Sequence, residues 1–110
     1  MDWQINEGRI WEKVNQPYEI ACRIITPKKQ ECTNLLVPVA VSASHVGFCS
    51  IRVEATWMQL GQAAGIAAAM AAINNRPVQA IDIKSLQQKL PAGGVILNRD
   101  VREWKTDDKL

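Results

Sequence analysis

The longest apolar stretch of the chain covers residues 54–73, which contain no proline and consist mainly of strong helix formers. Gln59 and Gln62 are the only strongly polar side chains in this stretch after Glu54, so the pattern predicts a long helix buried on most of its circumference. One side of this helix carries a stripe of small residues: Gly61, Gly65, Ala68, Ala69 and Ala72. Because glycine weakens a helix by about 1 kcal/mol relative to alanine, the stripe predicts close packing by a sheet, another helix or a ligand.

Three other segments have the patterns of short strands. Residues 18–24 alternate between apolar and mostly polar positions, which is typical of a strand with one buried face. Residues 34–41 form a continuous apolar run, as in a strand covered on both faces, and we expect it to end or bulge at Pro38. The triplet at residues 95–97 follows a turn at Gly93 and Gly94.

A second, shorter helix is predicted at residues 83–90. The run of residues 74–77, NNRP, ends the long helix, because asparagine tolerates a left-handed conformation and proline cannot continue a helix. Asp82 can cap the next helix, which stops before Pro91. Its apolar positions share one face: Ile83, Leu86 and Leu90.

These elements predict an α/β fold with one long buried helix rich in alanine and glycine, one shorter helix and two to three short strands. Such a set cannot close a sheet by itself, so the fold resembles part of a larger domain. We divide the chain into an N-terminal arm (residues 1–16), a main body (residues 17–97) and a charged tail (residues 98–110).

Charge and composition exclude several classes of partner. The chain has 110 residues, enough for one domain, and a net charge of +2 with no basic run beyond Lys28 and Lys29. Nucleic acid is therefore not expected as a main partner. The apolar helix is dominated by alanine and glycine rather than leucine and isoleucine, so no membrane span is expected. No signal peptide is recognisable, and a cytoplasmic location is the default expectation.

The cysteines and the histidine indicate neither a disulfide framework nor a metal site. Cys22, Cys32 and Cys49 form an odd set without a C-x-x-C pair, and we expect small, partly buried thiols. His45 is the only histidine, which excludes a site with several histidines and favours a structural role. No metal ligand is predicted.

The junction between the polar loop at residues 42–53 and the long helix is where chemistry is expected. A helix N-terminus offers unpaired N–H groups and a partial positive charge, which suit an anionic or electron-rich ligand. The serines beside His45 also allow a hydrolase interpretation, but no G-x-S-x-G motif surrounds them. Arg52 and Glu54 can be read as an exposed ion pair.

Several motifs together resemble the C-terminal part of a bacterial family of FAD-dependent oxidoreductases, some of whose members are labelled as xanthan lyases. The motifs are PYEI (17–20), PKK (27–29), ECTNLLVPV (31–39), SASHV (42–46), SIR (50–52), LGQAAG (60–65), DIKSLQQKL (82–90) and GVIL (94–97). The resemblance covers residues 17–97. It implies the C-terminal end of a glutathione-reductase-like FAD-binding domain, with FAD as cofactor and a small molecule as substrate.

The resemblance also implies a set of site residues. Those expected near the isoalloxazine ring are Ser44, His45, Ser50, Ile51 and Arg52, and the adjoining helix contributes Gly61 and Gln62. In the catalytic role, His45 can shuttle a proton and Arg52 can hold an anionic group. The helix N-terminus is expected to stabilise negative charge on the reduced flavin.

The chain also departs from the family pattern. Phe48 and Cys49 stand where members often have tyrosine and glycine, and Ala55 where they often have proline. The sequence contains no G-x-G-x-x-G fingerprint for the FAD pyrophosphate, so this chain alone is expected to be inactive and to need a missing N-terminal FAD-binding portion. The alternative is a non-catalytic α+β interaction module, which can self-associate through its apolar helix, or a degraded gene product.

Overall fold

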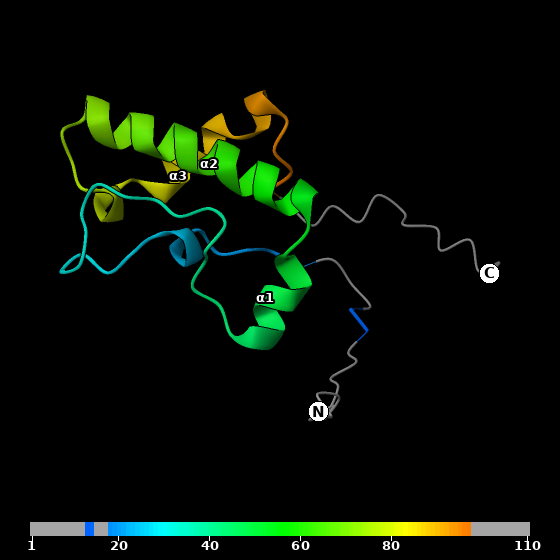
Figure 1. Cartoon of the computed structure of the whole chain (residues 1–110). Helices are drawn as coiled ribbons and strands as arrows, with labels where there is room; N and C mark the ends of the chain where they lie inside the picture. Colours follow the sequence, from blue (N-terminus) through cyan, green and yellow to red (C-terminus); the bar gives the residue numbers. More distant parts are fainter. Residues whose placement is uncertain (1–12, 15–17, 98–110) are drawn as a thin grey trace.

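The structure is a computed structural model that describes residues 13–14 and 18–97. The regular elements within these ranges are all helical (Figure 1). The α-helices are α1 (His45–Ile51), α2 (Glu54–Ile73) and α3 (Ile83–Lys89), and the 3₁₀ helices are η1 (Cys22–Ile25), η2 (Val78–Ala80) and η3 (Pro91–Gly93). The predicted arm at residues 1–16 lies almost entirely outside the described residues, and the tail at residues 98–110 lies outside them completely.

The predicted α/β class is wrong, because the described residues contain no strand. Residues 22–24 of the first predicted strand belong to η1, while residues 34–41 and 95–97 adopt no regular structure. Residues 24–42 do fold back on themselves, but only isolated backbone bonds join the two sides, from Val37 N to Ile25 O (2.8 Å) and from Ser42 N to Ile24 O (2.8 Å). Pro38 lies between these bonds and has no N–H to donate, so no ladder forms.

Helix α2 begins and ends as the sequence predicts, at Glu54 and Ile73. Its end is a Schellman motif: Asn75 has a positive φ of 47°, Arg76 N bonds Ala71 O, and Asn75 N bonds Ala72 O. Asparagine at this position tolerates the left-handed conformation, and Pro77 then prevents the helix from continuing.

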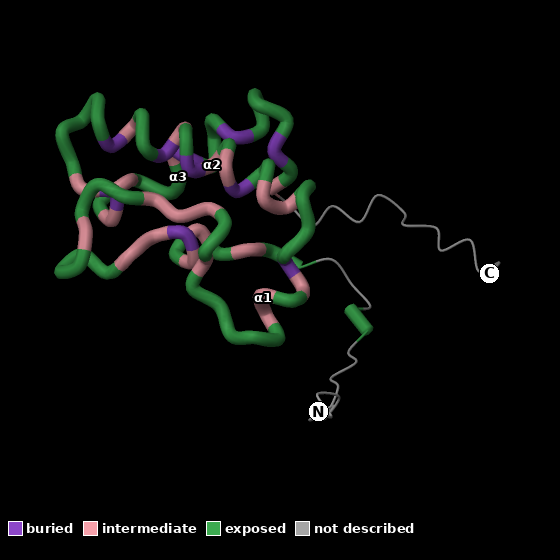
Figure 2. Tube along the Cα trace, in the orientation of Figure 1, coloured by how far each residue is buried: buried purple, intermediate pink, exposed green. Residues whose placement is uncertain are grey.

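The buried stripe of α2 differs from the small-residue stripe that the sequence indicates. Its members recur at helical spacing and are Leu60, Ala64, Ala67 and Ala71. In Figure 2 these buried positions alternate with exposed ones along the helix. The expected stripe is displaced from the buried stripe by one position toward the C-terminus. Of its two glycines, Gly65 is exposed and Gly61 is half-buried. A Cβ added at either glycine would have no neighbour within 4 Å among the described residues, so these residues do not cover that side.

The expectation that α2 is buried on most of its circumference is therefore wrong for the described chain. Met58 is 76% exposed and Ile73 84% exposed, while burial is confined to the single stripe. An apolar surface of this kind on one helix is unusual for a side that faces only water.

Helix α3 follows the prediction, with a cap at Asp82 whose carboxylate accepts from the backbone N–H groups of Lys84 and Ser85. Leu86 and Leu90 are buried, at 2% and 4% exposure, and form a cluster with Ala67 and Val95. Ile83, expected on the same face, is 44% exposed. Helix α3 and the 3₁₀ helix η2 both contact α2.

A second small cluster joins α2 to the N-terminal half of the described chain. Its buried members are Ile25, Leu60 and Ala64. Cys22 and Leu36 pack against both this cluster and the one at α3, so they connect the two. The core is thus two small clusters on neighbouring segments of one stripe of α2.

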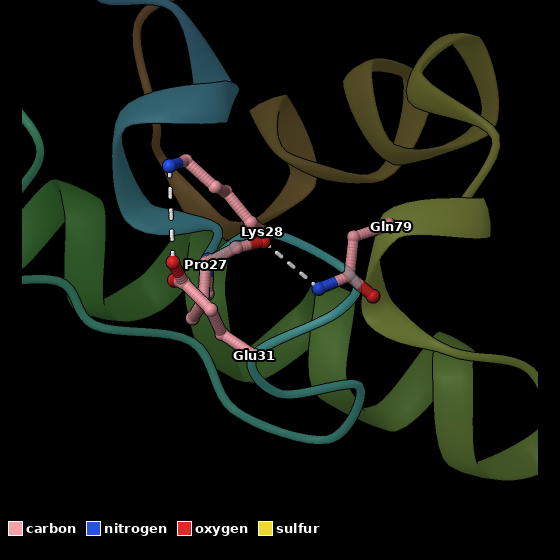
Figure 3. A network of polar contacts seen from close by, with 4 residues as sticks. All are labelled: Pro27, Lys28, Glu31 and Gln79. Atoms are coloured by element: carbon pink, nitrogen blue, oxygen red, sulfur yellow. Dashed lines mark hydrogen bonds and ion pairs between the residues drawn. The ribbon is translucent and has the colours of Figure 1, made fainter.

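Gln79 holds the turn at residues 27–31 against the segment that follows α2. Its side-chain Nε2 donates to Pro27 O at 2.9 Å and to Cys32 O at 2.7 Å, and the neighbouring Val78 N donates to Thr33 O at 2.9 Å. Figure 3 shows this amide beside Pro27. The Lys28 and Glu31 side chains, in contrast, form an exposed ion pair at 3.8 Å.

We predict that Gln79→Ala lowers the free energy of unfolding by about 1–2 kcal/mol, because it removes two hydrogen bonds and leaves two carbonyl groups without that donor. Urea unfolding followed by far-ultraviolet circular dichroism measures the change. The matched control is Lys28→Ala, which removes only the exposed ion pair and should change stability by less than about 0.5 kcal/mol. Equal effects of the two substitutions would show that the amide bonds contribute no more than a surface ion pair.

A second prediction concerns the pH dependence of the α3 cap. Hydrogen bonds from the Ser85 side chain and backbone lower the pKa of Asp82 below its ordinary value of 3.8. A carboxyl group whose pKa is lowered on folding stabilises the protein above its ordinary pKa, and this contribution is lost as the pH falls through the lowered value.

The substitution Asp82→Asn keeps a capping oxygen but cannot titrate. We therefore expect the stability difference between the native chain and Asp82→Asn to shrink as the pH is lowered from neutral through that range. Urea unfolding at a series of pH values measures this difference. A difference that stays constant with pH would exclude the titration of Asp82 as its origin.

Candidate functional site

Residues 45–51, expected as part of a polar loop, form the helix α1. Ser44 is its N-cap and accepts a hydrogen bond from Gly47 N at 3.1 Å through its side-chain oxygen. Serine is among the residues that favour this position, and the segment contains no proline to interrupt the helix. The loop prediction was wrong because Gly47 looked like a loop residue, although a helix can accommodate one glycine.

Two residues separate α1 from α2. Arg52 N still bonds Phe48 O at 3.0 Å, and Val53 then adopts an extended conformation (φ −117°, ψ 146°) that changes the direction of the chain. Helix α2 starts at Glu54 without a side-chain cap, so its first N–H groups receive no side-chain acceptor from Val53. Arg52 and Glu54 are both exposed and do not form the expected ion pair with each other.

A cleft of about 760 Å³ lies between α1 and the segment that leads into η1. This volume is in the range typical of small-molecule sites. Its apolar lining comes from both sides, and its polar groups are a phenol, a carboxylate, an imidazole, a thiol and a hydroxyl. The lining residues with polar side chains are Tyr18, Glu19, His45, Cys49 and Ser50.

The polar side chains of the cleft form two pairs. The Tyr18 hydroxyl and the Ser50 hydroxyl are hydrogen-bonded to each other across the cleft, and this bond connects α1 with the N-terminal segment. His45 Nε2 lies 3.9 Å from Cys49 Sγ, one helical turn further along α1. Each pair brings a possible proton donor next to a possible acceptor.

The predicted site residues fall into three places. His45, Ser50 and Ile51 line the cleft, and Ile51 is the buried residue of α1. Ser44 caps α1, and Arg52 ends it. The remaining two lie on α2, where Gly61 is half-buried and the exposed Gln62 donates from Nε2 to Gly93 O at 2.6 Å. Gln62 therefore holds η3 against α2 in this chain.

The three thiols differ more than the sequence suggests. All are free, but Cys49 is exposed, so the expectation of three partly buried thiols is wrong for this residue. Burial raises the pKa of the Cys22 thiol, and Cys32 Sγ donates to Asn34 Oδ1 at 3.2 Å. Among the described residues, no group of three or more histidine, cysteine or acidic side chains is arranged to hold a metal ion.

Sequence reasoning missed Tyr18 and Cys49 as members of the site. A spacing of four between His45 and Cys49 would have indicated their pairing, had residues 45–51 been predicted as a helix. No comparable local signal exists for Tyr18, because 32 positions separate it from Ser50.

Comparison with protein families identifies the chain. A family model described as FAD dependent oxidoreductase matches residues 2–90, which is most of the sequence and includes α1, α2 and the cleft. The chain belongs to the FAD-dependent oxidoreductase family. Comparisons with curated proteins and with solved structures give no match.

Full-length members of the FAD-dependent oxidoreductase family bind FAD. The cofactor has a flavin ring at one end and a pyrophosphate further along, and the two need different protein groups. Uncapped N–H groups at the start of α2 and the mixed lining of the cleft suit a flat, electron-rich ring. The pyrophosphate needs a glycine-rich turn before a helix, and the sequence contains none. The described residues therefore offer groups of the kind that the ring of FAD needs, whereas the sequence lacks the turn that its pyrophosphate needs. None of its described helices combines the length and apolar character needed to cross a bilayer.

We predict that Ser44→Ala destabilises α1 by about 1 kcal/mol, because it removes the N-cap acceptor. This change corresponds to an increase of about fivefold in the equilibrium constant for local opening of the helix. Hydrogen exchange at the Gly47 amide measures this directly, since that N–H donates to Ser44 Oγ. Ser42→Ala is the control, because it changes an exposed serine just before the cap. Unchanged exchange at Gly47 in Ser44→Ala would contradict the capping role.

Proposed function

We propose that the chain is the C-terminal part of an FAD-dependent oxidoreductase and contributes α1 and the start of α2 to the wall beside the flavin ring. The family match supports the chemistry, and the cleft beside α1 supports the location. We also propose that its relatives are the bacterial members of the family, some of which are labelled as xanthan lyases. The partner is the portion that binds the FAD pyrophosphate, and the substrate is a small organic molecule.

The uncovered side of α2 is the observation that carries the proposal. Gly61 and Gly65 interrupt a helix of otherwise good helix formers, and each costs about 1 kcal/mol relative to alanine. In the part of the chain that the structure describes, no atom lies within 4 Å of the place where a Cβ of either residue would stand. A polypeptide that packs closely against this side in the complete enzyme gives these glycines a physical role.

The role of each site residue follows from its place in the chain. FAD, when bound, supplies the acceptor for a hydride or for electrons from the substrate. The imidazole of His45 opens into the cleft and can move a proton between substrate and solvent. The exposed guanidinium of Arg52 can hold an anionic group of the substrate.

The remaining predicted residues have supporting roles. Ser44 and Ile51 position α1 through its cap and its buried contact, and Ser50 fixes one wall of the cleft through Tyr18. On α2, Gly61 permits close approach at the flavin-binding end, and Gln62 keeps the adjoining segment in place.

We predict that the purified chain folds but gives no saturable change in flavin absorption when titrated with FAD. Adding a separately expressed dinucleotide-binding portion from another family member should produce saturable binding. Gly65→Leu should weaken this binding at least about tenfold, because a large side chain on the uncovered side prevents close packing. The isolated variant should keep its stability or gain up to about 1 kcal/mol from helix propensity.

Gln87→Leu is the matched control, since it places the same side chain at an exposed position on α3. Flavin binding by the chain alone would overturn the need for a separate portion. Absence of binding in a mixture of folded components would overturn the flavin role. Concentration-dependent self-association that Gly65→Leu abolishes, without any flavin binding, would support the alternative, a non-catalytic interaction module.

A further inference from the structure

Cys49 is paired with a histidine inside the cleft, an arrangement that the proposed flavin role does not use. The two residues lie one turn apart on α1, with 3.9 Å between Cys49 Sγ and His45 Nε2. Both side chains are exposed and both line the cleft. A thiol becomes a nucleophile when it loses its proton, and an adjacent imidazole is the side chain that most often accepts it.

The other two thiols lack this arrangement. Cys22 is half-buried among apolar side chains, and its burial raises its pKa, which disfavours the thiolate. Cys32 Sγ donates a hydrogen bond to Asn34 Oδ1, an amide oxygen that does not act as a base. The chain therefore contains one thiol next to a base and two internal controls.

We propose that Cys49 and His45 form a thiol–imidazole pair that makes Cys49 a site of thiol–disulfide exchange with small, uncharged disulfides. In the forward step His45 Nε2 takes the proton of Cys49, and Cys49 Sγ attacks one sulfur of the disulfide. A new S–S bond forms as the old one breaks. The departing sulfur leaves with the electron pair of the broken bond and accepts the proton from His45, so the disulfide is the only oxidant required.

The lining of the cleft determines which disulfides can reach Cys49. Its larger apolar side chains come from both walls and are Val14, Ile20, Ile24, Val46 and Ile51. Glu19 lines the same cleft and disfavours a second negative charge. An aromatic or aliphatic disulfide without charge therefore suits the site better than an anionic one. This inference does not depend on flavin, because every group that it uses belongs to the described chain.

The test is the reaction of the purified, reduced chain with the neutral aromatic disulfide dithiodipyridine at neutral pH. Release of thiopyridone gives the rate, and peptide mass mapping identifies the modified cysteine. Cys49 should react on the order of tenfold faster than Cys22 or Cys32. His45→Gln, which keeps a polar side chain but cannot accept a proton, should slow Cys49 on the order of fivefold to tenfold.

Two controls separate the pair from a general effect of exposure. Cys32→Ser should leave the fast phase unchanged, and Cys49→Ser should remove it. In concentrated urea, where α1 is absent, His45→Gln should have no effect, which guards against a variant that merely folds poorly. A fast phase that maps to Cys32, or a Cys49 rate that His45→Gln does not change in the folded chain, would overturn the proposal.

Discussion

The contact along one stripe of α2 holds together the two hydrophobic clusters that form the core of the described chain. Leu60, Ala64, Ala67 and Ala71 form this stripe, and three of the four are alanine. Small side chains allow close approach, so Leu86 of α3 and the C-cap Leu90 can pack against one half of the helix while Ile25 packs against the other. Because each alanine buries little apolar area, the core depends on these few larger residues.

The sequence predicted the positions of α2 and α3, but not that of α1, and it predicted the buried side of α2 wrongly. Absence of proline, the asparagine at 75 and the acceptor at Asp82 act locally, so both ends of α2 and the start of α3 could be predicted. Helix α2 is apolar all around, and periodicity then gives no direction to its buried side. The stripe of small residues was chosen instead, and the structure buries the stripe beside it.

Strands and side-chain pairs depend on distant parts of the chain, which is why the sequence predicted them poorly. An alternating pattern becomes a strand only when a neighbour supplies a ladder, and Pro38 with two isolated backbone bonds provides none. His45, Ser50 and Ile51 were predicted as site residues because they lie within recognisable motifs, and they line the cleft. Tyr18 reaches Ser50 only through the folded chain, and the pairing of Cys49 with His45 required knowing that α1 is a helix.

The break at Val53 divides the chain into parts of unequal rigidity. Helix α1 buries only Ile51, whereas α2 buries a full stripe, so α1 can open at a smaller free-energy cost than the core can unfold. The cleft has one wall on this less stable helix. A ligand that bridges both walls would therefore increase the order of α1 without altering the packing of α2.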